Sequence, residues 1–132
     1  MSKFTLDIQA FVAKAKKNPE IVARSVTLKL FSAIIKGSPV KSGRFRMNWQ
    51  TTGATPATGL IAGVDPTGNK AINSAATFIT NTPVWDVFTL TNNLPYSERL
   101  EYGWSKQAPV GMVRVNIARF QQLLNEEAAK VR

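Results

Sequence analysis

The chain has 132 residues, a net charge of +9 and 44% hydrophobic residues, which suits one folded domain better than a disordered chain. It contains neither Cys nor His, so disulfides, thiol nucleophiles, imidazole bases and the usual ligands of zinc, copper and iron are excluded. The eight acidic residues show no spacing typical of a cation loop. No metal or other cofactor is expected.

The positive charge is concentrated in the first part of the chain. Residues 1–50 carry ten Lys and Arg against two acidic residues, whereas residues 51–132 carry seven against six. This asymmetry favours contact with an acidic partner, either nucleic acid or protein, although a solvated basic face explains it equally well. No stretch resembles a signal peptide or is long and apolar enough to span a bilayer, so we expect a cytosolic site of synthesis and no membrane contact.

Helices are expected at both ends of the chain. Apolar residues at helical spacing predict a first helix over residues 4–17 and a second from Pro19 to Lys36. The second is apolar over much of its circumference and should therefore pack on two sides. Apolar residues spaced three and four apart predict a long C-terminal helix over residues 113–131.

Residues 44–50 alternate between apolar and polar side chains, which predicts a half-buried strand. In such a strand Phe45, Met47 and Trp49 would face the core, and Arg44 and Arg46 would share the opposite face. Those two cations, with Lys41 before them, could follow a phosphate backbone, but no aromatic side chain shares their face. A solvated or interfacial face is favoured over dedicated DNA binding.

The remaining segments predict a few short elements. Strands are expected over residues 60–64 and 85–91, the latter in the centre of the sheet, and a helical turn over residues 95–102. Residues 69–81 fit either a short helix or part of a loop, and a flexible arm or hairpin is expected within 53–83. Because the strands are grouped, the fold class should be α+β, with N-terminal helices and a long C-terminal helix packed on a small antiparallel sheet.

No set of residues predicts catalysis. Ser38 and Lys41 have the outline of a nucleophile and base, but a serine near a lysine in a Pro/Gly loop is common by chance. Glu98 and Glu101, three apart on a helical turn, are better explained as a solvated or subunit-facing charge cluster. We therefore expect a binding protein rather than an enzyme.

Aromatic and charged residues are mixed in one short segment near the predicted helical turn. Tyr96, Glu98, Tyr102 and Trp104 are typical of a contact surface between proteins, although the segment could also simply cover the sheet.

Three segments, in this order, resemble small neck proteins of tailed bacteriophages. They are SPVKSGRFRMNW at 38–49, NNLPYSERLEYG at 92–103 and QAPVGMVR at 107–114. This family comprises head–tail connector and tail-completion subunits, also called minor tail components. Residues 53–83 have no counterpart in the resemblance.

The resemblance implies a structural virion protein that forms a ring, six-fold in symmetry, between the DNA-filled head and the tail. Its partners would be copies of itself, the connector proteins on the portal side, and the tail terminator or tail tube protein. Tyr96, Glu98, Tyr102 and Trp104 would then contact a subunit or partner. The cations Lys41, Arg44 and Arg46 would face either a neighbour or the genomic DNA in the lumen. The alternative function is that of a small basic cytosolic DNA-binding protein.

Overall fold

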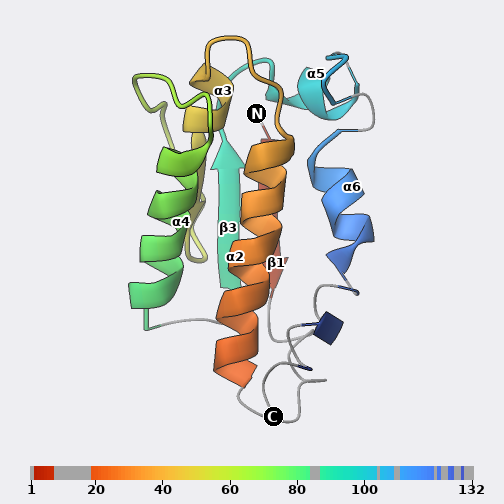
Figure 1. Cartoon of the computed structure of the whole chain (residues 1–132). Helices are drawn as coiled ribbons and strands as arrows, with labels where there is room; N and C mark the ends of the chain where they lie inside the picture. Colours follow the sequence, from red (N-terminus) through yellow and green to blue (C-terminus); the bar gives the residue numbers. More distant parts are fainter. Residues whose placement is uncertain are drawn as a thin grey trace.

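The computed structural model of the chain describes residues 2–7, 19–83, 87–103, 105–108, 111–120, 122, 125, 126 and 129. These residues form an α+β fold, as predicted, in which helices pack on a small antiparallel sheet (Figure 1). The elements in chain order are β1 (Ser2–Asp7), α2 (Pro19–Gly37), α3 (Arg44–Met47), β2 (Trp49–Thr52), α4 (Asn69–Asn81), β3 (Val87–Asn92), α5 (Ser97–Glu101) and α6 (Val113–Ala118).

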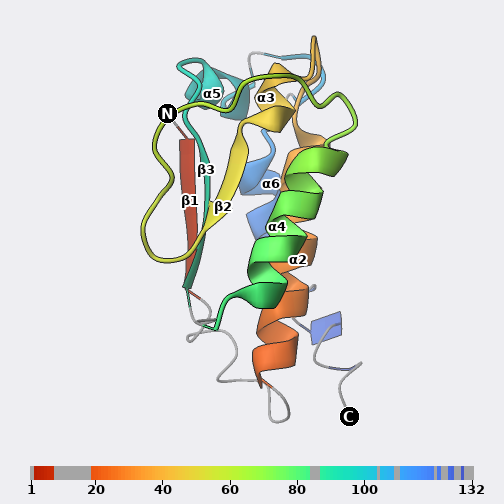
Figure 2. The same ribbon diagram turned by 90° about the vertical axis from the view of Figure 1, so that its left-hand side faces the viewer.

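The sheet has three strands in the order β1-β3-β2, and both pairings are antiparallel. The central position of β3 confirms the prediction for residues 87–91, whereas Trp85 lies outside the described residues. Helices α2 and α4 cover one face of the sheet, and the chain between β2 and α4 passes along its other side (Figure 2). Side-chain amides hold this loop: Asn48 bonds the backbone of Ile61, and Gln50 and Asn93 both donate to the carbonyl of Gly59.

Helix α2 is the centre of the core. It begins at Pro19, where the missing N–H of proline costs nothing, and it is buried against both α4 and α6. This confirms the predicted helix and its two-sided packing. Its fully buried apolar side chains are Val22, Ala23, Val26, Leu30, Phe31, Ile34 and Ile35.

The helix predicted near the N-terminus is wrong for the residues that the structure describes there. Ser2–Asp7 form β1, whose backbone pairs with β3 so that Phe4 lies opposite Leu90. The segment alternates between polar and apolar residues, which is the period of a strand, and pairing with a central strand decided the outcome. Residues 8–17 of the predicted helix lie outside the described residues.

The strand predicted over residues 44–50 is also wrong in its first half. Arg44–Met47 form the short helix α3, and the strand β2 begins only at Trp49. Phe45 and Trp49 are both buried, as expected, but they meet because they are four residues apart around a helical turn, with ring centroids 5.6 Å apart. Met47 is only partly buried. The strand expected over residues 60–64 does not form, and those residues belong to the loop.

Residues 69–81 form a helix rather than part of a loop. In α4, Ala71, Ala75 and Ile79 recur every four residues and are buried. The helix begins after Gly68, and the buried carboxylate of Asp65 accepts the Ala71 N–H at 2.9 Å.

The helical turn predicted over residues 95–102 is confirmed as α5. The long C-terminal helix is not: α6 starts at Val113 as predicted but ends at Ala118. Beyond residue 120 the structure describes only residues 122, 125, 126 and 129, so a continuous helix to Val131 stays a prediction.

Candidate functional site

Ser38 links the end of α2 to the sheet. Its buried hydroxyl donates to the carbonyl of Ile34 and accepts the indole N–H of Trp49, both at 2.8 Å. The Lys41 side chain, three residues on, is exposed. The hydroxyl of Ser38 therefore has a structural role, which accounts for its position without any pairing with Lys41.

Arg46 is bound to the backbone of its own fold. Its guanidinium donates to the carbonyls of Ser38 at 3.0 Å, Pro66 at 2.8 Å and Lys36 at 2.8 Å. Burial lowers the pKa of Arg46 from its ordinary value, while the carboxylate of Asp65 opposes this, and the guanidinium stays charged. The prediction that Arg46 shares an open face with Arg44 is wrong, because residues 44–47 form a helical turn and not a strand.

Gly43 closes the loop before α3. Its φ is +98°, and a Cβ there would lie 2.5 Å from the backbone nitrogen of Pro66. Its carbonyl accepts the N–H groups of both Met47 and Asp65. Only glycine fits this position, because the backbone is left-handed and Pro66 leaves no room for a side chain.

Glu101 joins α5 to the start of α6. Its carboxylate accepts the backbone N–H groups of Met112, Val113 and Arg114 at 2.8–2.9 Å, and the Arg114 Nε at 3.0 Å. Burial raises the pKa of Glu101, but the backbone and guanidinium donors outweigh it and hold this pKa below its ordinary value. The carboxylate is thus a helix cap, and the expectation of a solvated or subunit-facing Glu98–Glu101 pair is wrong for Glu101.

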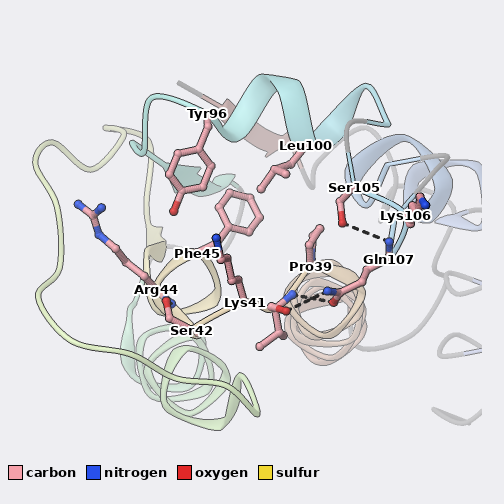
Figure 3. Close-up of a pocket in the computed structure, with 12 residues that line it drawn as sticks. Pro39, Lys41, Ser42, Arg44, Phe45, Tyr96, Leu100, Ser105, Lys106 and Gln107 are labelled. Carbon is pink, nitrogen blue, oxygen red and sulfur yellow. Dashed lines mark hydrogen bonds between the residues drawn. The ribbon is translucent and has the colours of Figure 1, made fainter.

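Gln107 ties the segment after α5 to the loop after α2. Its side-chain amide accepts the Val40 N–H at 2.8 Å and donates to the Val40 carbonyl at 2.9 Å. The Ser105 hydroxyl accepts the backbone N–H of Gln107 at 3.1 Å. Two loops that are 67 residues apart in sequence are therefore fixed side by side (Figure 3).

Between these two loops lies a cavity of about 520 Å³, called here the basic groove. It is at the end of the molecule where α2 stops and where α3 and α5 lie (Figure 1). Phe45, Tyr96 and Leu100 lie together in its middle, with Arg44 towards one end and Lys106 towards the other (Figure 3). Its described lining residues are Pro39, Val40, Lys41, Ser42, Gly43, Arg44, Phe45, Tyr96, Leu100, Ser105, Lys106 and Gln107.

The predicted contact residues fall in different places. Lys41, Arg44 and Tyr96 line the basic groove, whereas Glu98 is exposed on α5 and is not among its lining residues. Tyr102 is 68% exposed, and the Arg114 guanidinium lies over its ring, 4.7 Å from the centroid. Trp104 lies outside the described residues.

Sequence reasoning missed Lys106 and Gln107, which complete the groove from the far side. Neither has a local pattern that would have shown its role: Gln107 acts through hydrogen bonds to a loop far away in sequence, and Lys106 lines the groove as the residue next to it. It also missed the capping role of Glu101. The sequence offered one indication of a close contact there, which is Gly111 just before the helix start at Val113. In the structure a Cβ at Gly111 would lie 2.4 Å from the Glu101 carbonyl oxygen.

No protein-family model, curated protein or solved structure matches this chain. Among the described residues, none of the helices has the length and hydropathy needed to cross a membrane. The same part of the chain holds no group of three or more Asp or Glu side chains arranged to bind a metal ion.

Proposed function

We propose that the protein is a structural subunit of a tailed-phage neck, in which copies of the chain form a ring between the filled head and the tail. The observation that carries the proposal is the meeting of the three resembling segments. Residues 38–49 are far in sequence from residues 92–103 and 107–114, but the described residues of all three segments lie at one end of the fold (Figure 1). Phe45 and Tyr96 contact each other there, with ring centroids 6.0 Å apart, and Gln107 bonds Val40.

Hydrogen bonds also join the segments to one another. The Asn92 amide donates to the Phe45 carbonyl at 2.9 Å, which joins the first segment to the second. Glu101 binds the N–H groups at the start of α6, which joins the second to the third. A set of residues that builds one connected region is a better basis for a family resemblance than three independent short matches.

A second feature suits contacts between copies. Between residues 47 and 97 the only charged residues are Asp65, Lys70 and Asp86. The exposed side of α4 there presents Asn73, Ser74, Thr77 and Thr80, and the preceding loop exposes Leu60 and Val64. Copies of a chain with net charge +9 repel each other, so a side almost free of charge is where they can approach. In a ring, this side would meet a different patch on the next copy.

The mass of the purified protein in solution tests the proposal, by light scattering and negative-stain imaging, alone and mixed with phage tail tubes. We expect a ring, or a monomer that becomes a ring on the end of a tail. Thr77→Arg, on the exposed side of α4 where Lys70 is the one charged residue, should prevent assembly, whereas Ala118→Arg, at an exposed position of α6, should not. A chain that stays monomeric at high concentration and does not bind tail tubes would overturn the proposal.

DNA binding is the second candidate, favoured by the three exposed cations of the basic groove, Lys41, Arg44 and Lys106. It predicts affinity for duplex DNA that falls steeply as salt rises, with a slope that becomes shallower in Lys41→Ala with Arg44→Ala. Arg46 is not used in this test, because its replacement would damage the fold. Absence of binding in about 50 mM salt would remove this candidate.

A further inference from the structure

All the charged side chains among the described residues that line the basic groove are positive. Lys41 and Arg44 line it from the loop after α2 and from α3, and Lys106 lines it from the segment after α5 (Figure 3). All three side chains are exposed. None of the described lining residues is Asp or Glu, and none of the three cations has an ion pair with a described residue. The groove is thus complementary to an acidic ligand.

The floor of the groove is apolar. Tyr96 is 37% exposed and Phe45 is 5% exposed, and the centroids of their rings are 6.0 Å apart. Leu100 lies next to them and is partly buried (Figure 3). An apolar floor between cationic rims suits a ligand that carries an apolar side chain between negative charges.

The walls of the groove are fixed in advance. The two hydrogen bonds between Gln107 and Val40 hold the loops together, and Gly43 fixes the turn that places Lys41 and Arg44. A ligand that binds preformed walls pays little for ordering them. The volume of about 520 Å³ lies within the range of sites that enclose a small ligand, and is sufficient for a few residues of an extended peptide.

We propose that the basic groove binds a short acidic peptide segment of another protein. An apolar side chain of that segment would lie on Tyr96, with carboxylates directed to Arg44 at one end, to Lys106 at the other and to Lys41 between them (Figure 3). This inference rests on the proposed function, in that the segment would belong to an adjacent protein of the neck.

A peptide fits the groove better than a nucleic acid does. Nucleic-acid binding uses a track of cations along successive phosphates and exposed rings for base stacking. Here Arg46, the next cation along the chain, is bound to three backbone carbonyls. Phe45 is buried under Tyr96, so Tyr96 is the one described ring in the groove that a base could reach.

Fluorescence anisotropy with labelled peptides tests the inference. The probes are the peptide Asp-Glu-Asp-Phe-Asp-Glu-Asp, the same peptide with Ser in place of Phe, a Lys/Arg version of it, and a short oligo-dT of equal charge. The wild-type protein is expected to bind the first peptide most tightly. Tyr96→Ala should weaken binding of the Phe peptide and leave the Ser peptide unchanged.

Charge-reversed variants separate the groove from the net charge of the protein. Lys41→Glu with Lys106→Glu should weaken binding of the acidic peptide about tenfold or more. Lys70→Glu with Arg119→Glu changes the net charge equally at exposed positions outside the groove, and should have a much smaller effect. Circular dichroism confirms that each variant is folded. Equal losses in both double variants, or tighter binding of oligo-dT than of the peptide, would overturn the inference.

The light-scattering experiment keeps this inference separate from the proposed function. A protein that forms rings but binds none of the peptides would overturn only the peptide inference. A protein that binds the acidic peptide through the groove but stays monomeric and ignores tails would overturn only the neck function.

Discussion

The side-chain amide of Gln107 forms two hydrogen bonds with the backbone of Val40, one to its N–H and one to its carbonyl. The pair holds both walls of the basic groove, so Gln107→Ala should lower the free energy of unfolding by about 1 kcal/mol. It should also weaken peptide binding, because the loops lose their fixed spacing. Urea denaturation and anisotropy measure the two effects.

Gln107→Glu keeps one of the two hydrogen bonds and removes the other, since a carboxylate can accept the Val40 N–H but cannot donate to the Val40 carbonyl. Its stability should fall between those of the wild type and Gln107→Ala. Asn73→Ala, at an exposed position of α4, is the control and should leave stability unchanged. Equal stability of all four proteins would show that the pair does not fix the groove.

The sequence was sufficient for the parts of the fold that depend on local patterns. The apolar circumference of α2, the β-branched and aromatic residues of β3, and the turn of α5 all led to correct elements. The prediction from sequence failed where a short segment fits both the periodicity of a strand and that of a helix. Phe45 and Trp49 can lie on one side of a strand or of a helical turn, and only the docking of α3 on α4 decides between them.

The site was predictable only in part for a related reason. Exposed cations and aromatics, such as Arg44 and Tyr96, can be singled out from the sequence as candidate contact residues, and both of these line the groove. Polar residues that bind distant backbone groups cannot be recognised in this way. From the sequence Arg46 is predicted to be an exposed cation, but its partners Lys36 and Pro66 are ten residues before it and twenty after it. Such roles depend on the tertiary fold and leave no periodic pattern.

The cap formed by Glu101 makes stability depend on pH. The pKa of Glu101 is lower in the folded protein than its ordinary value. The contribution of the ionised carboxylate to the free energy of unfolding is therefore fully present above about pH 4.5 and is lost as pH falls through the folded pKa. Glu101→Gln should lower the free energy of unfolding at pH 7 by about 2 kcal/mol and flatten its decline below pH 4.5. Urea denaturation between pH 3 and about pH 7 gives both quantities.

Glu98→Gln is the matched control, because Glu98 is exposed on the same short helix. It should leave both the stability and its pH dependence close to those of the wild type. The same acid-induced decline in Glu101→Gln and in the wild type would contradict the role of Glu101.

Two glycines with nearly the same φ angle allow the energetic effect of the close contact at Gly43 to be measured. Gly43 and Gly63 have φ of +98° and +100°, but a Cβ at Gly63 meets nothing within 4 Å. Gly63→Ala should cost about 1 kcal/mol, the penalty for a left-handed backbone. Gly43→Ala should cost several kcal/mol, because Pro66 must also move. Thermal and urea denaturation compare the two, and similar losses would show that the contact with Pro66 relaxes easily.

The contrast between Arg44 and Arg46 separates a binding role from a structural one. Arg46→Lys keeps the charge but cannot reach three carbonyls with one ammonium group, so the free energy of unfolding should fall by about 2 kcal/mol. Arg44→Lys should change stability by less than about 0.5 kcal/mol, because its side chain is exposed. Urea denaturation of both variants gives these values, and equal losses would contradict the assignment. If the difference is found, any loss of ligand binding in an Arg46 variant must be attributed first to damage of the fold, whereas a loss in an Arg44 variant reports on the groove itself.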